Sequence, residues 1–514
     1  MTRSTSRVVA VLVVVLLLLV FGVIALGGVF WGLVFTNKTK PDLVAGLDRR
    51  GPVVILATPA ARRDFHGALG ELRKLHPRAA EEALDIGDLS GARRALTENR
   101  ARYAILVVKP EELDVNFAWK WLRLSTEIDE DPFVDVRTGF ITGAGPGEAE
   151  AFVKRISDAA SGRLKLPGAF VDNLGPNAMV AKTGFTKTAM SFMIPVLGER
   201  LSLSTISHGP RGFTRERLGS MDGAGLVHFG GHGYPDRVVD CLNGPFARKL
   251  KLAPCVVFNG ACYTGVCGRW FDVRGRMRQK KVRAAESFCL SMIANNTVGY
   301  LAALHPDHGV PVYQELEYLA VTGATLGETL KYTHDGVVMG AGGKLPRLPE
   351  LRDGMARPEK SPAEIMLNGT AARVLFGDPA LSVTKAFAMP PFALSARAGK
   401  DGAFRVVARL QNAALRSEFT DTYASDLAAV KNGFNDRALI SWELPKGWKS
   451  VSRVEVVAAN TPGGSQLRYR LVGWAVEHED RARTLRVQVD LPSKGYMQSA
   501  FRQRGSSIEI LVNR

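Results

Sequence analysis

The chain has 514 residues, 46% of them hydrophobic and 23% charged, which is ordinary for a globular protein and enough for two or three domains. No fixed-period repeat is present, which argues against a solenoid. The net charge of +17 is compatible with contact to anionic lipids or polyanions, but the densest basic run, Arg274–Arg283, has no interleaved aromatic residues, so no nucleic-acid partner is expected.

The first predicted element is a transmembrane helix at residues 8–36, which carry no charge. A bilayer core needs about 20 apolar residues in a helix, whereas the apolar region of a signal peptide has only about 7–15. We therefore predict an uncleaved signal-anchor that contacts the lipid bilayer through residues 8–36. A cleaved signal with a long apolar region is the alternative.

The orientation of this span follows from its form. Lys and Arg residues after the span outnumber Arg3 and Arg7 before it, which by charge alone favours the opposite orientation. A short basic segment followed directly by an apolar run is nevertheless typical of a signal-anchor. We predict a single-pass protein with residues 1–7 as a cytoplasmic tail and the bulk of the chain outside the cytoplasm, in the periplasm or the extracellular space.

Residues 37–48 are predicted to be a linker, and residues 49–385 an α/β domain, with 49–170 and 171–385 as candidate subdomains. Helices are expected at Phe65–Leu75, Glu148–Ala160 and Ala284–Ile293. Short apolar strands are expected at Val53–Ala57, Ala104–Val108, Asp135–Ile141, Leu226–Phe229, Cys255–Phe258 and Val298–Leu304. This alternation indicates a mostly parallel, buried sheet with flanking helices, whose active site lies at the carboxyl ends of strands.

Residues 386–514 show a different pattern, in which apolar residues alternate with period two. Ala438–Leu444, Leu467–Leu471 and Leu485–Leu491 follow this pattern, and turn residues such as Pro462–Gly464 separate the runs. We predict a small C-terminal β-sandwich, joined to the preceding domain near Met389–Pro391.

Two predicted strands end in residues that carry chemistry. One leads into Gly230-Gly231-His232-Gly233, and the next leads into Asn259-Gly-Ala-Cys262. If the strands are neighbours, His232 and Cys262 emerge at one edge, where the histidine can activate the thiol as a nucleophile. His228 is the alternative histidine, but it lies inside its strand and is expected to pack in the sheet.

The five cysteines, an odd number, all lie between residues 241 and 289. Cys267 is the alternative nucleophile, although no strand directly precedes it. Cys255 and Cys289 are expected in the core. The set, completed by Cys241, lacks the paired spacing of a zinc site, so no metal is expected.

The order strand–Gly-His-Gly and strand–Ala-Cys-x-x-Gly resembles the catalytic centre of the caspase-like cysteine peptidases, and of gingipains in particular. Three further segments are similar to gingipain segments: Asp131–Ile156, Glu286–Leu304 and Leu375–Leu381. The resemblance covers about Val53 to Val383. It also implies that the C-terminal β-sandwich is immunoglobulin-like.

The resemblance implies acyl transfer, with Cys262 and His232 as the catalytic pair and no cofactor. It also implies that the backbone N–H groups of Gly233 and Cys262 hold the oxyanion. The family includes enzymes that cut after Arg or Lys, for which a carboxylate in the pocket is needed. Asp307, in the loop after Val298–Leu304, is the candidate substrate-binding residue, and Asp236 is the alternative.

Two other functions remain open. A catalytically inactive caspase-like fold would serve as a binding or assembly module at the membrane. An anchored binder of anionic polymers rests on the net charge alone. The favoured prediction is a membrane-anchored cysteine endopeptidase that acts on protein or peptide substrates; the sequence does not indicate an oligomeric state.

Overall fold

The computed structural model describes residues 43–174, 202–207, 219–238, 242–273, 276–307, 315–316, 318–319, 322–357, 361–385, 392–399, 402–411, 419–420, 436–448, 450–479, 482–492, 500–501 and 503–514. The predicted cytoplasmic tail, the membrane span and residues 37–42 of the linker lie outside these residues. Within the described ranges, no helix is both long enough and apolar enough to span a bilayer.

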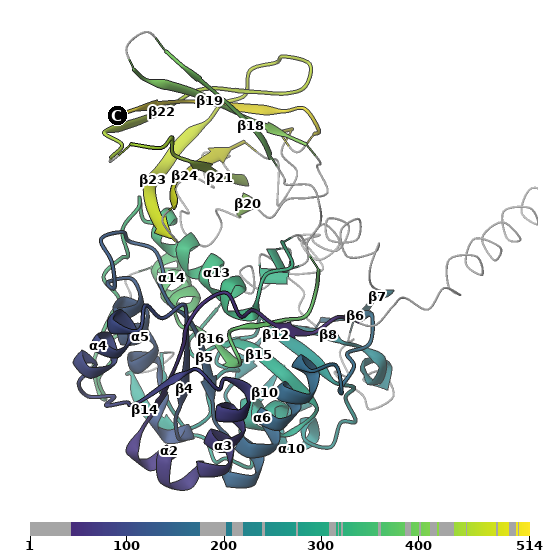
Figure 1. Ribbon diagram of the computed structural model, residues 1–514. Coiled ribbons are helices and arrows are strands. Elements are labelled where there is room, and N and C mark those ends of the chain that lie inside the picture. The colour runs from purple at the N-terminus through teal and green to yellow at the C-terminus, as the bar shows by residue number, and fades with distance from the viewer. Residues whose placement is uncertain are drawn as a thin grey trace, which may run out of the picture. The chain divides into compact units, whose positions relative to one another are not determined.

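A ten-stranded sheet forms the centre of the α/β region (Figure 1). Its buried strands are rich in Val, Ile, Leu and Ala, as both faces are covered. In spatial order the strands are β3 (Ala80–Ala83), β2 (Val53–Ala57), β4 (Tyr103–Val107), β5 (Arg137–Ile141), β16 (Arg373–Gly377), β15 (Thr297–Ala303), β12 (Cys255–Asn259), β8 (Leu226–Gly230), β6 (Ala169–Leu174) and β7 (Ser202–Ser207).

The strands of this sheet run in two directions. Every neighbouring pair is parallel except β15 and β16, which are antiparallel. The prediction of a mostly parallel sheet is therefore right for each half, whereas the whole sheet is mixed. As a consequence, β16 begins at the edge where β15, β12 and β8 end.

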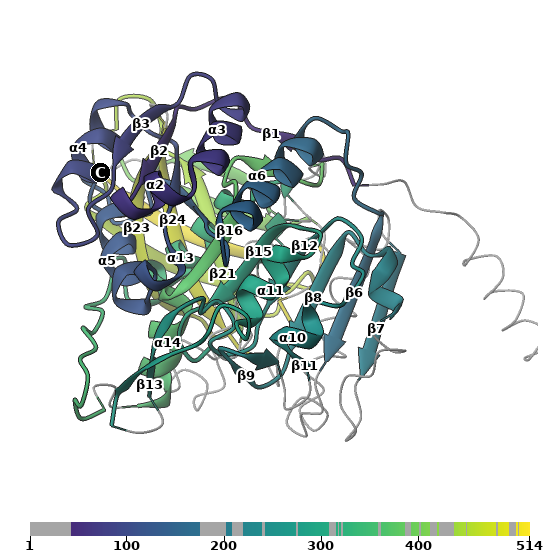
Figure 2. The same cartoon turned by 90° about the horizontal axis from the view of Figure 1, so that it is seen from below.

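Helices cover both faces of the sheet (Figures 1 and 2). On one face, α3, α6 and α11 pack together and α6 and α11 contact β15; on the face toward β23 and β24, α13 contacts β5 and β16 and packs on α14. The helices are α2 (Pro59–Asp64), α3 (His66–Leu75), α4 (Ser90–Glu98), α5 (Val115–Ser125), α6 (Pro146–Ala160), α10 (Gly244–Ala247), α11 (Phe288–Ala294), α13 (Leu326–Gly340) and α14 (Pro362–Ala371), with 3-10 turns η1 (Pro110–Glu112) and η2 (Gly219–Gly223).

Local sequence explains where several of these helices begin. The side chain of Asp114 caps α5 by accepting from the Phe117 N–H at 3.0 Å, and Thr325 caps α13 by accepting from the Glu328 N–H at 3.1 Å. Pro146 occupies the first turn of α6, where a missing N–H costs nothing. Most of α13 is buried, since it lies between the sheet and the C-terminal strands.

Small strand pairs complete the α/β region. They form three short sheets: β1 (Gly46–Leu47) with β17 (Leu381–Ser382); β9 (Gly233–Tyr234), β10 (Arg237–Val238) and β11 (Leu242–Asn243); and β13 (Arg269–Asp272) with β14 (Arg278–Lys281). In Figure 2, β9 and β11 lie beyond the ends of β8 and β12.

The described residues from 392 onward form two antiparallel sheets of four strands. One is ordered β18 (Phe392–Ala398), β19 (Phe404–Leu410), β25 (Ser507–Asn513), β22 (Arg453–Asn460), and the other β20 (Phe419–Thr420), β21 (Asp436–Glu443), β24 (Ala482–Leu491), β23 (Arg470–Glu479). The alternating residues of β21 and β24 are buried in a core that both sheets share, as their period predicts. The immunoglobulin-like assignment and the boundary at residue 386 remain predictions.

Candidate active site

The two strands that carry the predicted motifs are neighbours in the sheet. β8 and β12 pair in parallel, with Val227 beside Val257 and His228 beside Phe258. Both strands therefore end at the same edge, and β15, which is parallel to β12, ends there too. This confirms the expectation that the segments after all three strands lie together.

The backbones of Gly233 and Cys262 are in direct contact. A Cβ atom added at Gly233 would lie 2.2 Å from the Cys262 carbonyl oxygen and 2.7 Å from its nitrogen, so only glycine fits. Gly231, with φ of 130°, turns the chain sharply after β8. His232 stands between these glycines with an exposed side chain. The glycines thus bring the histidine segment onto the cysteine segment.

The Cys262 sulfur lies against the loop that follows β15. Its Sγ is 3.0 Å from the Asp307 carbonyl oxygen and 3.4 Å from the Asp307 nitrogen. The thiol can thus donate to the carbonyl, and the N–H of the same residue points to the sulfur. Cys262 is partly exposed, so the sulfur combines access with fixed hydrogen-bonding groups.

Three other cysteines in the described ranges are buried. Burial raises the pKa of Cys255 and of Cys267 to about 12, and that of Cys289 well above its usual value. The Cys267 Sγ also lies 3.4 Å from the Pro110 carbonyl oxygen. Because a thiolate is the nucleophilic form, these surroundings favour Cys262. Cys241 lies outside the described residues.

A strained turn follows Cys262. Tyr263 has φ of 62°, which is uncommon for a bulky residue. Its hydroxyl accepts from the Val273 N–H at 3.3 Å, and its ring packs edge-on against Trp270 with 5.0 Å between ring centroids. Backbone strain of this kind costs about 1–3 kcal/mol and concentrates at functional sites. This strained position directly follows the candidate nucleophile.

The alternative histidine, His228, is buried in β8 as expected. Its Nδ1 lies 2.6 Å from the Asp172 Oδ1 on the adjacent strand β6, where the two residues face each other in register. This His–Asp pair is internal to the sheet, whereas His232 is exposed beyond its end. The sequence did not indicate the pairing because it joins strands that are 56 residues apart.

The two candidate pocket carboxylates have different surroundings. The Asp307 side chain is completely buried, and its Oδ2 accepts from the Arg373 Nη1 at 2.6 Å. The side chain of Asp236, in the turn between β9 and β10, is 41% exposed and lies 3.4 Å from Arg237. The backbone of Asp307 thus lines the site while its carboxylate faces inward. Asp236 is the candidate whose carboxylate reaches solvent.

Sequence reasoning missed the buried residues behind this site. Arg373 contacts Asp307, Glu315 and the carbonyl oxygen of Asn259. A lone arginine that opens the apolar run Val374-Leu-Phe376 is the one signal that could have identified it. The positive φ of Tyr263 left no trace in the sequence, as tyrosine is not typical of such positions.

Within the part of the chain that the structure describes, one acidic cluster could hold a cation. Carboxylate oxygens of Asp129, Asp131 and Asp135 lie within 4.8 Å of one another, in the segment between α5 and β5. Asp131 accepts from the backbone N–H groups of Phe133 at 2.8 Å and His478 at 2.5 Å. These bonds account for the position of Asp131 without an ion, and the cluster is not part of the Cys262 site.

No family model matches the chain, and neither does any curated protein. Similar solved structures include the complex of the Porphyromonas gingivalis RgpB pro- and mature domains and the Arg-specific cysteine proteinase gingipain R (RgpB). Each shares 11% identity with this chain at a TM-score of 0.42, over 90% of this chain and 99% of the other.

A second kind of structure is matched over a shorter length. The match to the Saccharomyces cerevisiae separase–securin complex covers 55% of this chain and 17% of the matched chain, at 13% identity and a TM-score of 0.30. Gingipain structures are therefore among those to which this chain is similar, and gingipains are the family that its His232 and Cys262 motifs resemble.

Proposed function

We propose that the chain is a cysteine endopeptidase in which Cys262 is the nucleophile and His232 transfers protons. The observation that carries the proposal is the contact between the backbones of Gly233 and Cys262, which holds the histidine segment against the cysteine. The partly exposed sulfur and the strained turn after it support the same assignment.

The reaction is acyl transfer in two steps. His232 takes the proton from the Cys262 thiol, the thiolate attacks the peptide carbonyl, and the proton passes to the leaving amine as the C–N bond breaks. Water then attacks the thioester and releases the acid and the free thiol. The N–H groups of Gly233 and Cys262 are proposed to hold the oxyanion, a role in which one donor is typically worth about 10²–10³ in turnover.

The proposed substrates are proteins or peptides cut after Arg or Lys. An acidic group near the site would select such side chains through charge-assisted hydrogen bonds. Because the Asp307 carboxylate is buried against Arg373, we assign this role to Asp236. Asp236→Asn should then raise KM for Arg substrates more than it lowers kcat, and peptides with other residues at that position should be unaffected.

We further propose that residues 8–36 anchor the enzyme, with its active site outside the cytoplasm. The support is the uncharged apolar run in the sequence. Replacing this run with a cleavable signal peptide should release the protein into the soluble fraction. Retention of that variant on membranes after a carbonate wash would show a second attachment and reject the single anchor.

The decisive experiment on function uses an Arg-containing peptide with a thiol-directed electrophile. We expect it to modify Cys262, as located by mass spectrometry, and to block peptide cleavage. Cys262→Ala should abolish both labelling and turnover, while Cys267→Ala should retain most activity because its sulfur is buried. A protein that folds but neither reacts with the electrophile nor cleaves a peptide library is a binding module instead.

A further inference from the structure

Arg373 is a buried charge directly behind the candidate nucleophile. It is the first residue of β16, and it pairs in register with Ala303 near the end of β15. Its side chain has no exposed surface. An arginine is almost never fully buried unless it is paired, so its contacts report what it holds in place.

The guanidinium makes four hydrogen bonds. Nε and Nη2 donate to the two carboxylate oxygens of Glu315 at 2.7 and 2.8 Å. Nη1 donates to the Asp307 Oδ2 at 2.6 Å and to the Asn259 carbonyl oxygen at 3.1 Å. The two parallel hydrogen bonds to Glu315 fix the plane of the guanidinium, and this plane sets the position of Nη1.

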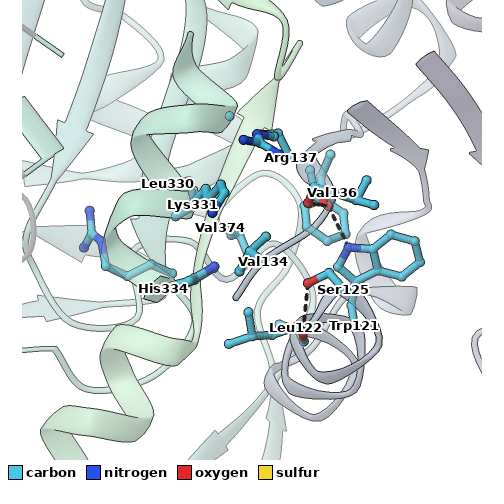
Figure 3. A pocket seen from close by; sticks show the side chains of 15 residues that line it. Trp121, Leu122, Ser125, Val134, Val136, Arg137, Leu330, Lys331, His334 and Val374 are labelled. Atoms are coloured by element: carbon cyan, nitrogen blue, oxygen red, sulfur yellow. Dashed lines mark hydrogen bonds between the residues drawn. The ribbon is translucent and has the colours of Figure 1, made fainter. Parts of the chain in front are cut away.

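The surroundings of Arg373 are closely packed as well. His334 of α13 lies near it in the interior, and burial lowers the pKa of His334 to about 4. Figure 3 shows His334, Lys331 and Val374 beside a cavity of about 30 Å³ between α13 and the sheet. Arg373 therefore has little freedom to move.

The two groups that Nη1 joins belong to the two segments around the Cys262 sulfur. Asn259 ends β12 and lies three residues before Cys262; its Oδ1 also accepts from the Ala261 N–H at 2.9 Å. Asp307 contacts the sulfur with its backbone carbonyl and nitrogen. A single nitrogen atom of Arg373 thus ties the cysteine segment to the loop against which its sulfur rests.

We propose that Arg373 is a positioning residue for Cys262, acting through Asp307 and the Asn259 carbonyl. It sets the distance between the sulfur and the Asp307 backbone, and thereby the direction in which the thiolate meets a substrate carbonyl. A misplacement of about 1 Å can cost about 10²-fold in rate. The proposal rests on the proposed function in that Cys262 is taken as the nucleophile.

Arg137 provides a matched control for this idea. It opens β5, the strand next to β16, and the pairing of Phe140 with Phe376 sets the two arginines at the same level. It is also buried with two carboxylate partners, Glu328 and Glu479. Neither partner belongs to the segments around Cys262, so loss of the Arg137 fork should cost stability without moving the sulfur.

The test compares Arg373→Lys with Arg137→Lys in the full chain. Lysine keeps the charge but not the fork, so both variants should melt at lower temperature. We expect Arg373→Lys to lower the rate at which iodoacetamide alkylates Cys262 by about tenfold or more, with kcat lowered similarly and KM within about twofold. Arg137→Lys should leave the alkylation rate, kcat and KM near those of the wild type.

Equal alkylation rates in the two variants would overturn the proposal, since Arg373 would then serve stability alone. If Arg373→Lys does not fold, Asp307→Asn takes its place, because the amide still accepts from Arg373 but without the ion pair. This variant should shift the alkylation rate in the same direction, and an unchanged rate would also reject the idea. Iodoacetamide reports on the sulfur without turnover, so a failed peptidase assay with an Arg373-dependent alkylation rate rejects only the proposed function.

Discussion

Cys262 differs from the buried cysteines of the described chain in how its neighbours approach it. Gly233 lies against its backbone, Asp307 lies against its sulfur, and the strained Tyr263 follows it. Each contact depends on a backbone position rather than on a side-chain charge. The site should therefore be sensitive to small changes in volume at Gly233.

Gly233→Ala tests this sensitivity. The added methyl would overlap the Cys262 carbonyl and nitrogen, so the two segments must separate and the proposed oxyanion donors diverge. We expect turnover to fall by about 10²-fold or more, measured as kcat on a peptide substrate. Gly70→Ala is the control, because α3 has open space there and alanine should raise stability by about 0.5–1 kcal/mol. Unchanged turnover in Gly233→Ala would remove the contact from the mechanism.

At the scale of elements, the segment between α5 and β5 holds a carboxyl group with an unusually high pKa. Burial, helped by the nearby carboxylates of Asp129 and Asp131, raises the pKa of Asp135 from 3.8 to about 8. Between pH 4 and pH 8, Asp135 is therefore protonated in the folded protein and ionised in the unfolded chain. The contribution of Asp135 to stability falls as the pH rises through this window and is constant above it.

Asp135→Asn should remove this dependence. Asparagine is neutral at every pH, and its oxygen can still accept from the Ile128 N–H, as Asp135 does at 3.0 Å. We expect the variant to match the wild type near pH 4–5 and to exceed it by at least ~1 kcal/mol in free energy of unfolding at pH 8. Urea unfolding at the two pH values measures the difference.

The opposite sign is expected for Asp158→Asn. A hydrogen bond from Arg163 lowers the pKa of Asp158. The ionised Asp158 therefore stabilises the folded protein at neutral pH, and this contribution is lost as the pH falls below the ordinary pKa of an aspartate. The asparagine variant should be slightly less stable at pH 8 and equal to the wild type in acid. An Asp135→Asn gain of the same size at pH 5 and pH 8 would contradict the raised pKa.

At the scale of the whole described chain, ion pairs join the C-terminal strands to the α/β region. Glu477 of β23 accepts from Lys331 of α13 at 2.6 Å, and Glu479 accepts from Arg137 at 2.5 Å and from Arg102 at 2.8 Å. Lys331 and Arg137 are almost fully buried, so removal of the strands would leave them with fewer partners and new contact with water.

Deletion of residues 386–514 should lower the stability of the protein more than it lowers the reactivity of Cys262. Losing a partner of a buried pair typically costs about 3–5 kcal/mol, so the melting temperature should drop by roughly 5 °C or more. At a temperature where the truncated protein stays folded, the alkylation rate of Cys262 should remain within about twofold of the wild type, because its contacts lie before residue 386. If the truncated protein folds but Cys262 no longer reacts, the C-terminal strands contribute to the site.

The local elements of the α/β region could be predicted from the sequence because their signals are local. The expected strand Val53–Ala57 is β2, and the expected strands at Leu226, Cys255 and Val298 match β8, β12 and β15 within a residue or so. Apolar runs of this length have few other stable conformations once both faces are covered. The glycines that follow two of these apolar runs likewise indicated His232 and Cys262 as candidate site residues, because glycines at a strand end allow a sharp turn.

Only the tertiary structure decided which distant charges meet. The antiparallel pairing of β15 with β16 puts Arg373 at the edge where β12 ends, and so turns the Asp307 carboxylate inward. No periodicity encodes this contact, because it joins residues 66 positions apart. The sequence by itself determined the elements and the candidate nucleophile; the order of strands determined what holds that nucleophile in place, because a buried charge must find its partner wherever the sheet brings one.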